Sequence, residues 1–330
     1  MVAPAFPPKP LSPAHPARRP SPDATAEVCL AVDVGGTKLA AGLVDRRGTL
    51  LSSRRCPTLA RSDAETLFAQ LSGLVDEVLD QSDLQPVVCG VGCGGPMTGA
   101  GEFVSPLNIP AWREFPLRAR LARHTGLPTG VDNDAKALAL GEGWCGAAKG
   151  CSDFIAMVVS TGIGGGIVLD GRLLEGSTGN AGHIGHVVVE PDGRRCACGG
   201  RGCLEAETSG LAIEAVTGRP PAEAGAEVVA RAGRLVGRAV ASVANLLDLT
   251  LAVVSGSVAL GFGRPFFAAA EEELSQRAKL SFSRDVRIVP GALSGDGPLV
   301  GAAAIGWRVA SEAACGSGPG WPGAGGEVSG

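Results

Sequence analysis

The chain is poor in aromatic residues and in side chains that titrate near neutral pH. Of its 330 residues 4% are aromatic, none is Tyr, and only 4 are His. It also lacks any apolar stretch close to the roughly 20 residues that cross a bilayer, so a membrane-spanning helix is not expected. With so few imidazoles, any site that uses His has few candidates.

Signals for secretion are missing as well. The first thirty residues do not combine a basic start with an apolar run of about seven residues or more. The 10 cysteines are therefore expected in a reducing cytoplasm, either buried as small apolar side chains or bound to a metal. Burial in the core is favoured for isolated cysteines in apolar, strand-like contexts, such as Cys29 and Cys89.

Concentrated positive charge is the third absence. The formal net charge is -4 and the basic residues are scattered, whereas binding a nucleic-acid backbone needs a cationic stripe. Nucleic acid is not expected as a partner. What the chain does have is 45% hydrophobic residues, enough to build the core of one large or two medium domains.

Composition and periodicity divide the chain. Strand–turn–strand patterns at 28–45 and 154–174 alternate with helical spacing at 64–80, 222–247 and 266–278. This alternation predicts two α/β domains that meet in a cleft. The expected divisions are a disordered Pro-rich tail at 1–26, an N-terminal domain at 27–140 completed by a helix near 296–310, a C-terminal domain at 141–295, and a disordered Gly-rich tail at 311–330.

Two Gly-rich turns join pairs of expected strands. In "AVDVGGTK" an acid ends the first strand, and "STGIGGG" repeats the turn in the second domain. Glycine lets backbone N–H groups approach phosphate oxygens, and an acid at a strand end can hold Mg²⁺. An ordinary hairpin turn is the alternative for each. The candidate phosphate and Mg²⁺ residues are Asp33, Gly35, Gly36, Thr37, Lys38, Thr161 and Gly162.

Neither turn is a P-loop, because the spacing G-x-x-x-x-G-K-[ST] is absent. A third Gly pattern, at Gly90, Gly92 and Gly95, matches G-x-G-x-x-G after a strand. Pro96 and a loop follow where a dinucleotide fold needs a helix. NAD is therefore not expected as a cofactor.

"TGVDNDAKALALGE" places acids between a short strand and a helix at 129–142. Asp132 or Asn133 can cap that helix. Asp134 is then free to take a proton from a substrate hydroxyl that attacks a phosphoryl group.

"RRCACGGRGCLE" follows shortly after two histidines in "AGHIGH". His186 with Cys196, Cys198 and Cys203 supplies one imidazole and three thiolates, the closed donor set of structural Zn²⁺. The glycines between the cysteines allow a tight reversal of the chain. A metal here would hold a flexible loop in place and present Glu205 and His186 to a substrate.

Together these motifs resemble the ROK family (repressor, open reading frame, kinase) of sugar kinases. They occur in the family's order over about residues 28–308: "DVGGTK", "GCGGP", "SPLNIPAWREFPL", "VDNDAKA", "STGIGGGI", "AGHIGH", "CACGGRGCLE" and "VVSGSVA". The resemblance implies the two-domain actin-like and hexokinase-type (ribonuclease H-like) fold. It also implies ATP and Mg²⁺ as cofactors beside structural Zn²⁺, a hexose substrate, and a homo-oligomer, either a dimer or a tetramer.

By this resemblance Asp134 is the catalytic base. The implied sugar ligands are Gly95, Asn108, Asn133, His183, His186 and Glu205, and Gly256 is implied to lie near the adenine and ribose. The expected reaction is ATP-dependent phosphorylation of a hexose at its 6-hydroxyl, with glucose as the first candidate.

One residue departs from the family pattern, since members commonly have Glu where this chain has His183. A carboxylate accepts hydrogen bonds with both oxygens, whereas a neutral imidazole has one acceptor and one donor. Mannose, fructose, allose or an N-acetylhexosamine therefore stay open as substrates, and so does a non-catalytic sugar sensor. A ROK repressor is not expected, because only about 26 Pro-rich residues precede the first strand, too few for a helix-turn-helix domain.

Overall fold

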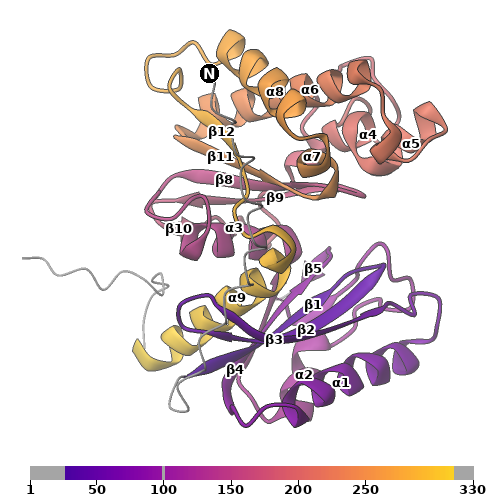
Figure 1. Ribbon diagram of the computed structural model, residues 1–330, viewed down its shortest axis with the longest axis vertical. Helices are drawn as coiled ribbons and strands as arrows, with labels where there is room; N and C mark the ends of the chain where they lie inside the picture. The colour runs from indigo at the N-terminus through magenta and orange to yellow at the C-terminus, as the bar shows by residue number, and fades with distance from the viewer. Residues whose placement is uncertain (1–26, 99–100, 316–330) are drawn as a thin grey trace, which may run out of the picture.

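The computed structural model describes residues 27–98 and 101–315. These residues form two α/β units stacked along the long axis of the molecule, each built on a five-stranded sheet (Figure 1). The expected tail at 1–26 and residues 316–330 lie outside the described residues, whereas 311–315 belong to the last helix.

The first sheet has the strand order β3-β2-β1-β4-β7. Strands β1 to β3 are antiparallel, and β4 and β7 run parallel to β1. Every residue of β1 is buried, as expected for a strand covered on both faces. The bounds are β1 (Val28–Val34), β2 (Lys38–Asp45), β3 (Leu50–Pro57), β4 (Pro86–Cys93) and β7 (Thr129–Asn133).

The second sheet repeats this plan in the order β10-β9-β8-β11-β12. Strands β8 to β10 are antiparallel, and β11 and β12 run parallel to β8. Both strand–turn–strand predictions are confirmed as the hairpins β1–β2 and β8–β9. The bounds are β8 (Phe154–Val159), β9 (Ile163–Leu169), β10 (Arg172–Leu173), β11 (Leu251–Ser255) and β12 (Arg287–Pro290).

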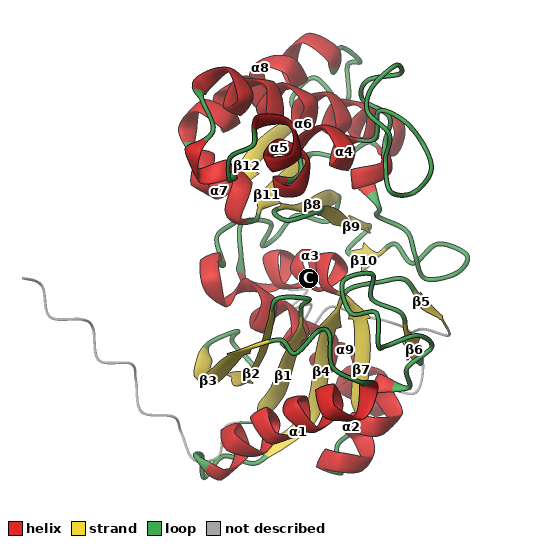
Figure 2. Cartoon of the chain, turned by 90° about the vertical axis from the view of Figure 1, so that its right-hand side faces the viewer, coloured by secondary structure: helices red, strands yellow, loops and turns green. Residues whose placement is uncertain are grey.

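Two helices that pack on each other, α3 (Asp134–Cys145) and α9 (Gly297–Cys315), lie between the sheets (Figure 2). Helix α9 lies on β1, β4 and β7 of the first sheet, and α3 packs on β8 and β9 of the second. The boundary expected between residues 140 and 141 thus falls inside one continuous helix that joins the two units.

The outer faces of the sheets carry the remaining long helices. In the first unit α1 (Ala64–Asp80) and α2 (Leu117–Thr125) share a core with the sheet, and in the second α6 (Ala226–Leu247) and α8 (Arg264–Arg277) pack together against theirs. Helix α1 has the predicted bounds. Cys29 and Cys89 are fully buried, which confirms the core interpretation.

Short elements complete the described chain. They are β5 (Met97–Thr98), β6 (Phe103–Val104), α4 (Leu204–Thr208), α5 (Gly210–Thr217), α7 (Ser257–Phe262) and 3-10 turns at Ile184–His186, Pro221–Glu223 and Ser294–Asp296. A strand, β5, follows Gly95, so the third Gly pattern does not lead into a helix. Among residues 27–98 and 101–315 no helix is both long and apolar enough to cross a membrane.

Candidate active site

The candidate catalytic acids meet at one edge of the first sheet. Strands β1, β4 and β7 are parallel, so their carboxyl ends lie at the same edge. In register, Asp33 of β1 lies beside Gly92 of β4, which lies beside Asp132 of β7. The turn after β1, the Gly95 loop after β4 and the start of α3 after β7 are therefore neighbours.

Asp134 is the first residue of α3, and the residue before it caps the helix. The Asn133 side chain accepts a hydrogen bond from the Ala135 N–H at 3.0 Å, which decides between the two predicted caps. The Asp134 carboxylate accepts from the same N–H at 2.8 Å. Asp132 is buried and is paired with Lys136 and Arg308.

The two acids influence each other electrostatically. Burial raises the pKa of Asp33 from 3.8 to about 6; the charge of Asp134 adds to the rise, while Lys38 and Arg55 oppose it. Desolvation by the surrounding protein also raises the pKa of Asp134, although its side chain is accessible to solvent. The nearby His183 opposes this rise in the pKa of Asp134.

The first Gly-rich turn packs against the expected sugar loop. A Cβ added at Gly36 would lie 2.4 Å from the Cβ of Asn108, so only glycine permits this approach. A Cβ at Gly95 would lie 3.3 Å from the Asn133 amide nitrogen. The structure thus brings four of the predicted residues together around Asp33.

Two hydrogen bonds hold the first Gly-rich turn, one within the β1–β2 hairpin and one from the residue that follows β3. The Gly35 N–H donates to the Lys38 carbonyl at 3.0 Å, and the Thr58 hydroxyl donates to the Gly35 carbonyl at 2.7 Å. Thr37 remains exposed at the tip. The backbone is therefore fixed while the hydroxyl of Thr37 is available to a ligand.

The second Gly-rich turn contacts Glu205. The Glu205 carboxylate accepts from the Ile163 N–H at 2.8 Å, and a Cβ at Gly162 would lie 2.8 Å from the same oxygen. A Cβ at Gly164 would lie 2.9 Å from the Cβ of Ala135. Glu205, the second turn and the first turn of α3 are therefore close neighbours, as predicted for one site.

Gly256 lies against the start of the second Gly-rich turn. It has φ 101°, and a Cβ there would lie 2.3 Å from the carbonyl oxygen of Val159, the last residue of β8. The following residue, Ser257, exchanges a hydrogen bond of 2.9 Å with Ser160. These two hydroxyls stand beside Thr161 and were not singled out in the sequence.

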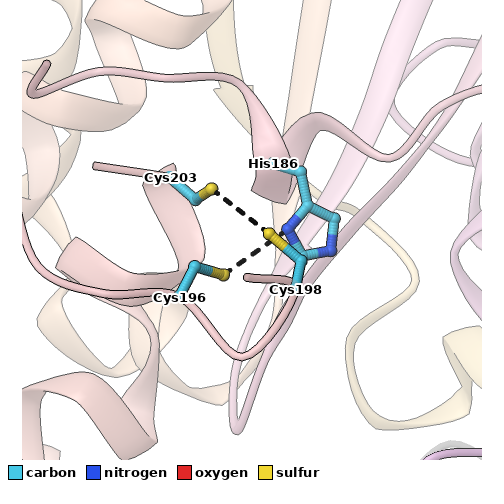
Figure 3. A group of neighbouring side chains, drawn as sticks. All are labelled: His186, Cys196, Cys198 and Cys203. Carbon is cyan, nitrogen blue, oxygen red and sulfur yellow. Dashed lines mark hydrogen bonds between the residues drawn. The ribbon is translucent and has the colours of Figure 1, made fainter. Parts of the chain in front are cut away.

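The four predicted metal ligands converge (Figure 3). Their donor atoms all lie within 4.8 Å of one another; the Sγ atoms of Cys198 and Cys203 are 3.7 Å apart, and Cys196 Sγ is 3.7 Å from His186 Nδ1. A tetrahedral zinc site with bonds of about 2.0 to 2.3 Å has ligand–ligand distances of about 3.5 to 3.8 Å. The residues present therefore fit such an ion.

Protein contacts also support this loop. Glu207, buried in α4, accepts from the Arg194 N–H at 2.6 Å and pairs with the side chains of Arg194 at 2.9 Å and Arg231 at 2.7 Å. Burial alone would raise the pKa of Glu207, but the Arg194 N–H and the two guanidinium groups hold it below its usual value. Sequence analysis missed Glu207 because its partner on α6 is 24 residues away.

His183 lies beside the metal ligand His186 and near enough to Asp134 to affect its pKa. Its Nδ1 is 2.9 Å from the Asn180 carbonyl oxygen, so this nitrogen carries the proton and Nε2 is an acceptor in the neutral ring. The His183 and His186 rings are stacked with centroids 6.2 Å apart. His183 thus faces the site from the segment that precedes the 3-10 turn.

Comparison with known proteins decides which family has this arrangement. The profile of the ROK family matches residues 29–308. The chain belongs to the ROK family. The expected two-domain fold is confirmed by a ROK hexokinase from Thermus thermophilus, whose crystal structure superposes with a TM-score of 0.76 at 31% identity, over 86% of this chain and 99% of that one.

Curated relatives of this ROK chain are sugar kinases. An N-acetylmannosamine kinase from Haemophilus influenzae (strain PittEE) is 36% identical over 250 residues, which cover 71% of this chain and 82% of the relative. A glucokinase from Thermotoga maritima is 41% identical over 186 residues, or 56% and 58% of the two chains. The relatives agree with the predicted enzyme class and differ in their sugar.

Proposed function

We propose that this ROK protein transfers a phosphoryl group from ATP to the 6-hydroxyl of a hexose. The observation that carries the proposal is the position of Asp134, an exposed carboxylate at the start of α3 with one Gly-rich turn on either side. The relatives of this chain that are sugar kinases support the same reaction class. Glucose stays the first candidate substrate.

Asp134 acts as the general base in this proposal. Burial raises the pKa of Asp134, which makes its carboxylate a better proton acceptor. The Ala135 N–H and the start of α3 stabilise that charge and orient the oxygen. The sugar hydroxyl would lose its proton to Asp134 as it attacks the phosphorus.

The two turns hold the nucleotide. Asp33, Gly35, Gly36, Thr37 and Lys38 bind phosphate and Mg²⁺ on one side, and Thr161 and Gly162 bind phosphate on the other, with Gly256 beside the adenosine. When bound, Mg²⁺ neutralises charge that develops on the phosphate oxygens. Closure of the two units would exclude water from the transfer.

The sugar lies between the Gly95 loop and the metal loop. Asn108, Asn133, His183, His186 and Glu205 bind its hydroxyls. Zn²⁺ has a structural role, since four protein ligands leave no open coordination position. The Nδ1 of His186 faces the sulfurs, and its second ring nitrogen points away from them (Figure 3), which leaves that nitrogen for a sugar hydroxyl.

The first test is a coupled assay of ADP release with Mg-ATP against six sugars: glucose, mannose, fructose, allose, N-acetylglucosamine and N-acetylmannosamine. Turnover with one sugar well above the others supports the kinase and identifies what His183 selects. Glucose and N-acetylmannosamine are compared first, because both occur as substrates in the names of relatives. If zinc-loaded protein turns over none of the six, yet one raises its melting temperature, the non-catalytic sensor replaces the proposal.

A further inference from the structure

A buried lysine lies two residues after the proposed base. The Lys136 side chain is 1% exposed, in the first turn of α3. Its ammonium donates to the Gly179 carbonyl at 2.9 Å, is hydrogen-bonded to the Glu175 carboxylate, and lies 3.4 Å from an Asp132 carboxylate oxygen. A buried ammonium is costly without such partners, so its surroundings demand an explanation.

Arg308 of α9 pairs with the same two acids. Its guanidinium lies 3.2 Å from Asp132 and 3.0 Å from Glu175. Two cations and two carboxylates thus join β7, α3, α9 and the segment after β10. Replacing one partner of such a network leaves the others unpaired, whereas the network as a whole adds little net stability. A defined geometry is what it provides.

The network fixes the position of residues 174–183, which connect β10 to the 3-10 turn η1 (Ile184–His186) and which we call the β10–η1 loop. Three of its glycines have positive φ: Gly176 at 74°, Gly179 at 82° and Gly182 at 104°. Glycine confers little conformational restriction on a loop. The loop closes on itself through a hydrogen bond of 3.0 Å from the Ala181 N–H to the Glu175 carbonyl. Lys136 contacts it at two points, Glu175 and Gly179.

The loop ends at His183. Lys136 binds the Gly179 carbonyl, and the next carbonyl, that of Asn180, accepts from His183 Nδ1. At the other side, Lys136 shares the first turn of α3 with Asp134. The lysine therefore connects the helix turn that carries the proposed base to the loop that carries His183.

We propose that Lys136 is a positioning residue that holds the β10–η1 loop against α3, and so fixes the place of His183 before the sugar binds. This inference rests on the proposed function for its kinetic consequence but not for its structural one. Because the lysine acts on the sugar side, its loss changes the KM for the sugar more than the KM for ATP.

The kinetic test compares Lys136→Met with wild type and with the control Lys149→Met, an exposed lysine beyond α3. Without Lys136, sugar binding would also have to order the loop. The lost charge-assisted hydrogen bond would then lower the affinity for the sugar about tenfold. We expect the KM for the panel's best sugar to rise about tenfold in Lys136→Met, with the KM for ATP within about twofold. An unchanged sugar KM, or equal rises in both KM values, would overturn the proposal.

Glu175→Gln is the second variant, because its carboxylate is half-exposed and its replacement keeps the side-chain shape. We expect the same selective rise in sugar KM, of smaller size. It carries the kinetic test if Lys136→Met does not fold.

A measurement without substrates separates this proposal from the proposed function. Hydrogen–deuterium exchange of peptides covering residues 174–183 should be faster in Lys136→Met and Glu175→Gln than in wild type and Lys149→Met. This result would stand even if no sugar were turned over. Unchanged exchange of the loop in both folded variants would overturn the proposal.

Discussion

The two sheets repeat one strand order in the two units (Figure 1). The edges where their parallel strands end nevertheless carry different side chains. The first edge has two carboxyl groups, those of Asp33 and Asp134. The second edge has the hydroxyls of Ser160, Thr161 and Ser257. A repeated architecture therefore supplies two Gly-rich turns, and the side chains around them give each turn its own chemistry.

The carboxyl groups of the first edge and the hydroxyl groups of the second suit different steps of one reaction. Burial, and next the charge of Asp134, raise the pKa of Asp33. In the proposed reaction the acids of the first edge would move a proton and hold a cation. The hydroxyls and backbone N–H groups of the second edge are neutral donors, which can approach a polyanion without repelling it.

The largest effect should come from removing the acid at the first edge. Asp134→Asn should lower kcat by about 10²- to 10⁴-fold, the range of general-base contributions, with sugar binding largely retained. Steady-state kinetics and calorimetric binding of the sugar measure the two quantities. Ser257→Ala, the matched change at the second edge, should cost less than about tenfold. Similar losses in both variants would refute the division between the edges.

Removing the metal should affect the second unit alone. Cys203→Ser should lose bound zinc and lower the melting temperature of the second unit by about 5–10 °C, which corresponds to about 2–3 kcal/mol in a unit of about 150 residues. The ion pairs of Glu207 limit the loss. Elemental analysis and thermal unfolding test this, with Cys56→Ser in β3 as control. Full zinc content in the serine variant would exclude Cys203 as a ligand.

The third effect leaves the chemistry aside and concerns the stability cost of Asp33. Its folded pKa is raised from 3.8 to about 6, so the native state binds this proton more tightly than the unfolded state. The resulting stability is complete below pH 3.8 and is lost as the pH rises through 6. At pH 8 the charged carboxylate therefore disfavours folding by about 3 kcal/mol.

Asp33→Asn removes that cost. Without nucleotide or Mg²⁺, the variant should be more stable than wild type by up to about 3 kcal/mol at pH 8, and the difference should shrink at pH 4. Urea unfolding at the two pH values measures it. Ser160→Ala at the second edge should show no such pH-dependent gain. A gain in Asp33→Asn that is equal at both pH values would mean that the charge of Asp33 is not its cause.

Local signals predicted the parts of the site that lie close together in the sequence. The two hairpin turns, the cap at Asn133 and the cysteine cluster each depend on residues within about ten positions, where spacing fixes geometry. Helix α6 begins at Ala226 instead of near 222, because Pro221–Glu223 form a 3-10 turn first.

These local signals do not reveal ion pairs between residues that are far apart in the sequence. Lys136 stands among alanines and leucines on α3, four residues before the buried Leu140, and the sequence analysis did not single it out. Its partner Glu175 is 39 residues away, and Arg308 is 176 residues from Asp132. Only the folded chain shows which charges balance one another inside the protein.

Helix α3 is shared by both units: it packs on α9, which lies on the first sheet, and on β8 and β9 of the second. Its first residue is Asp134. If one unit rotates against the other, α3 lies near the axis, where displacements are smallest. Asp134 would then move much less than the residues that lie far from α3 in either unit.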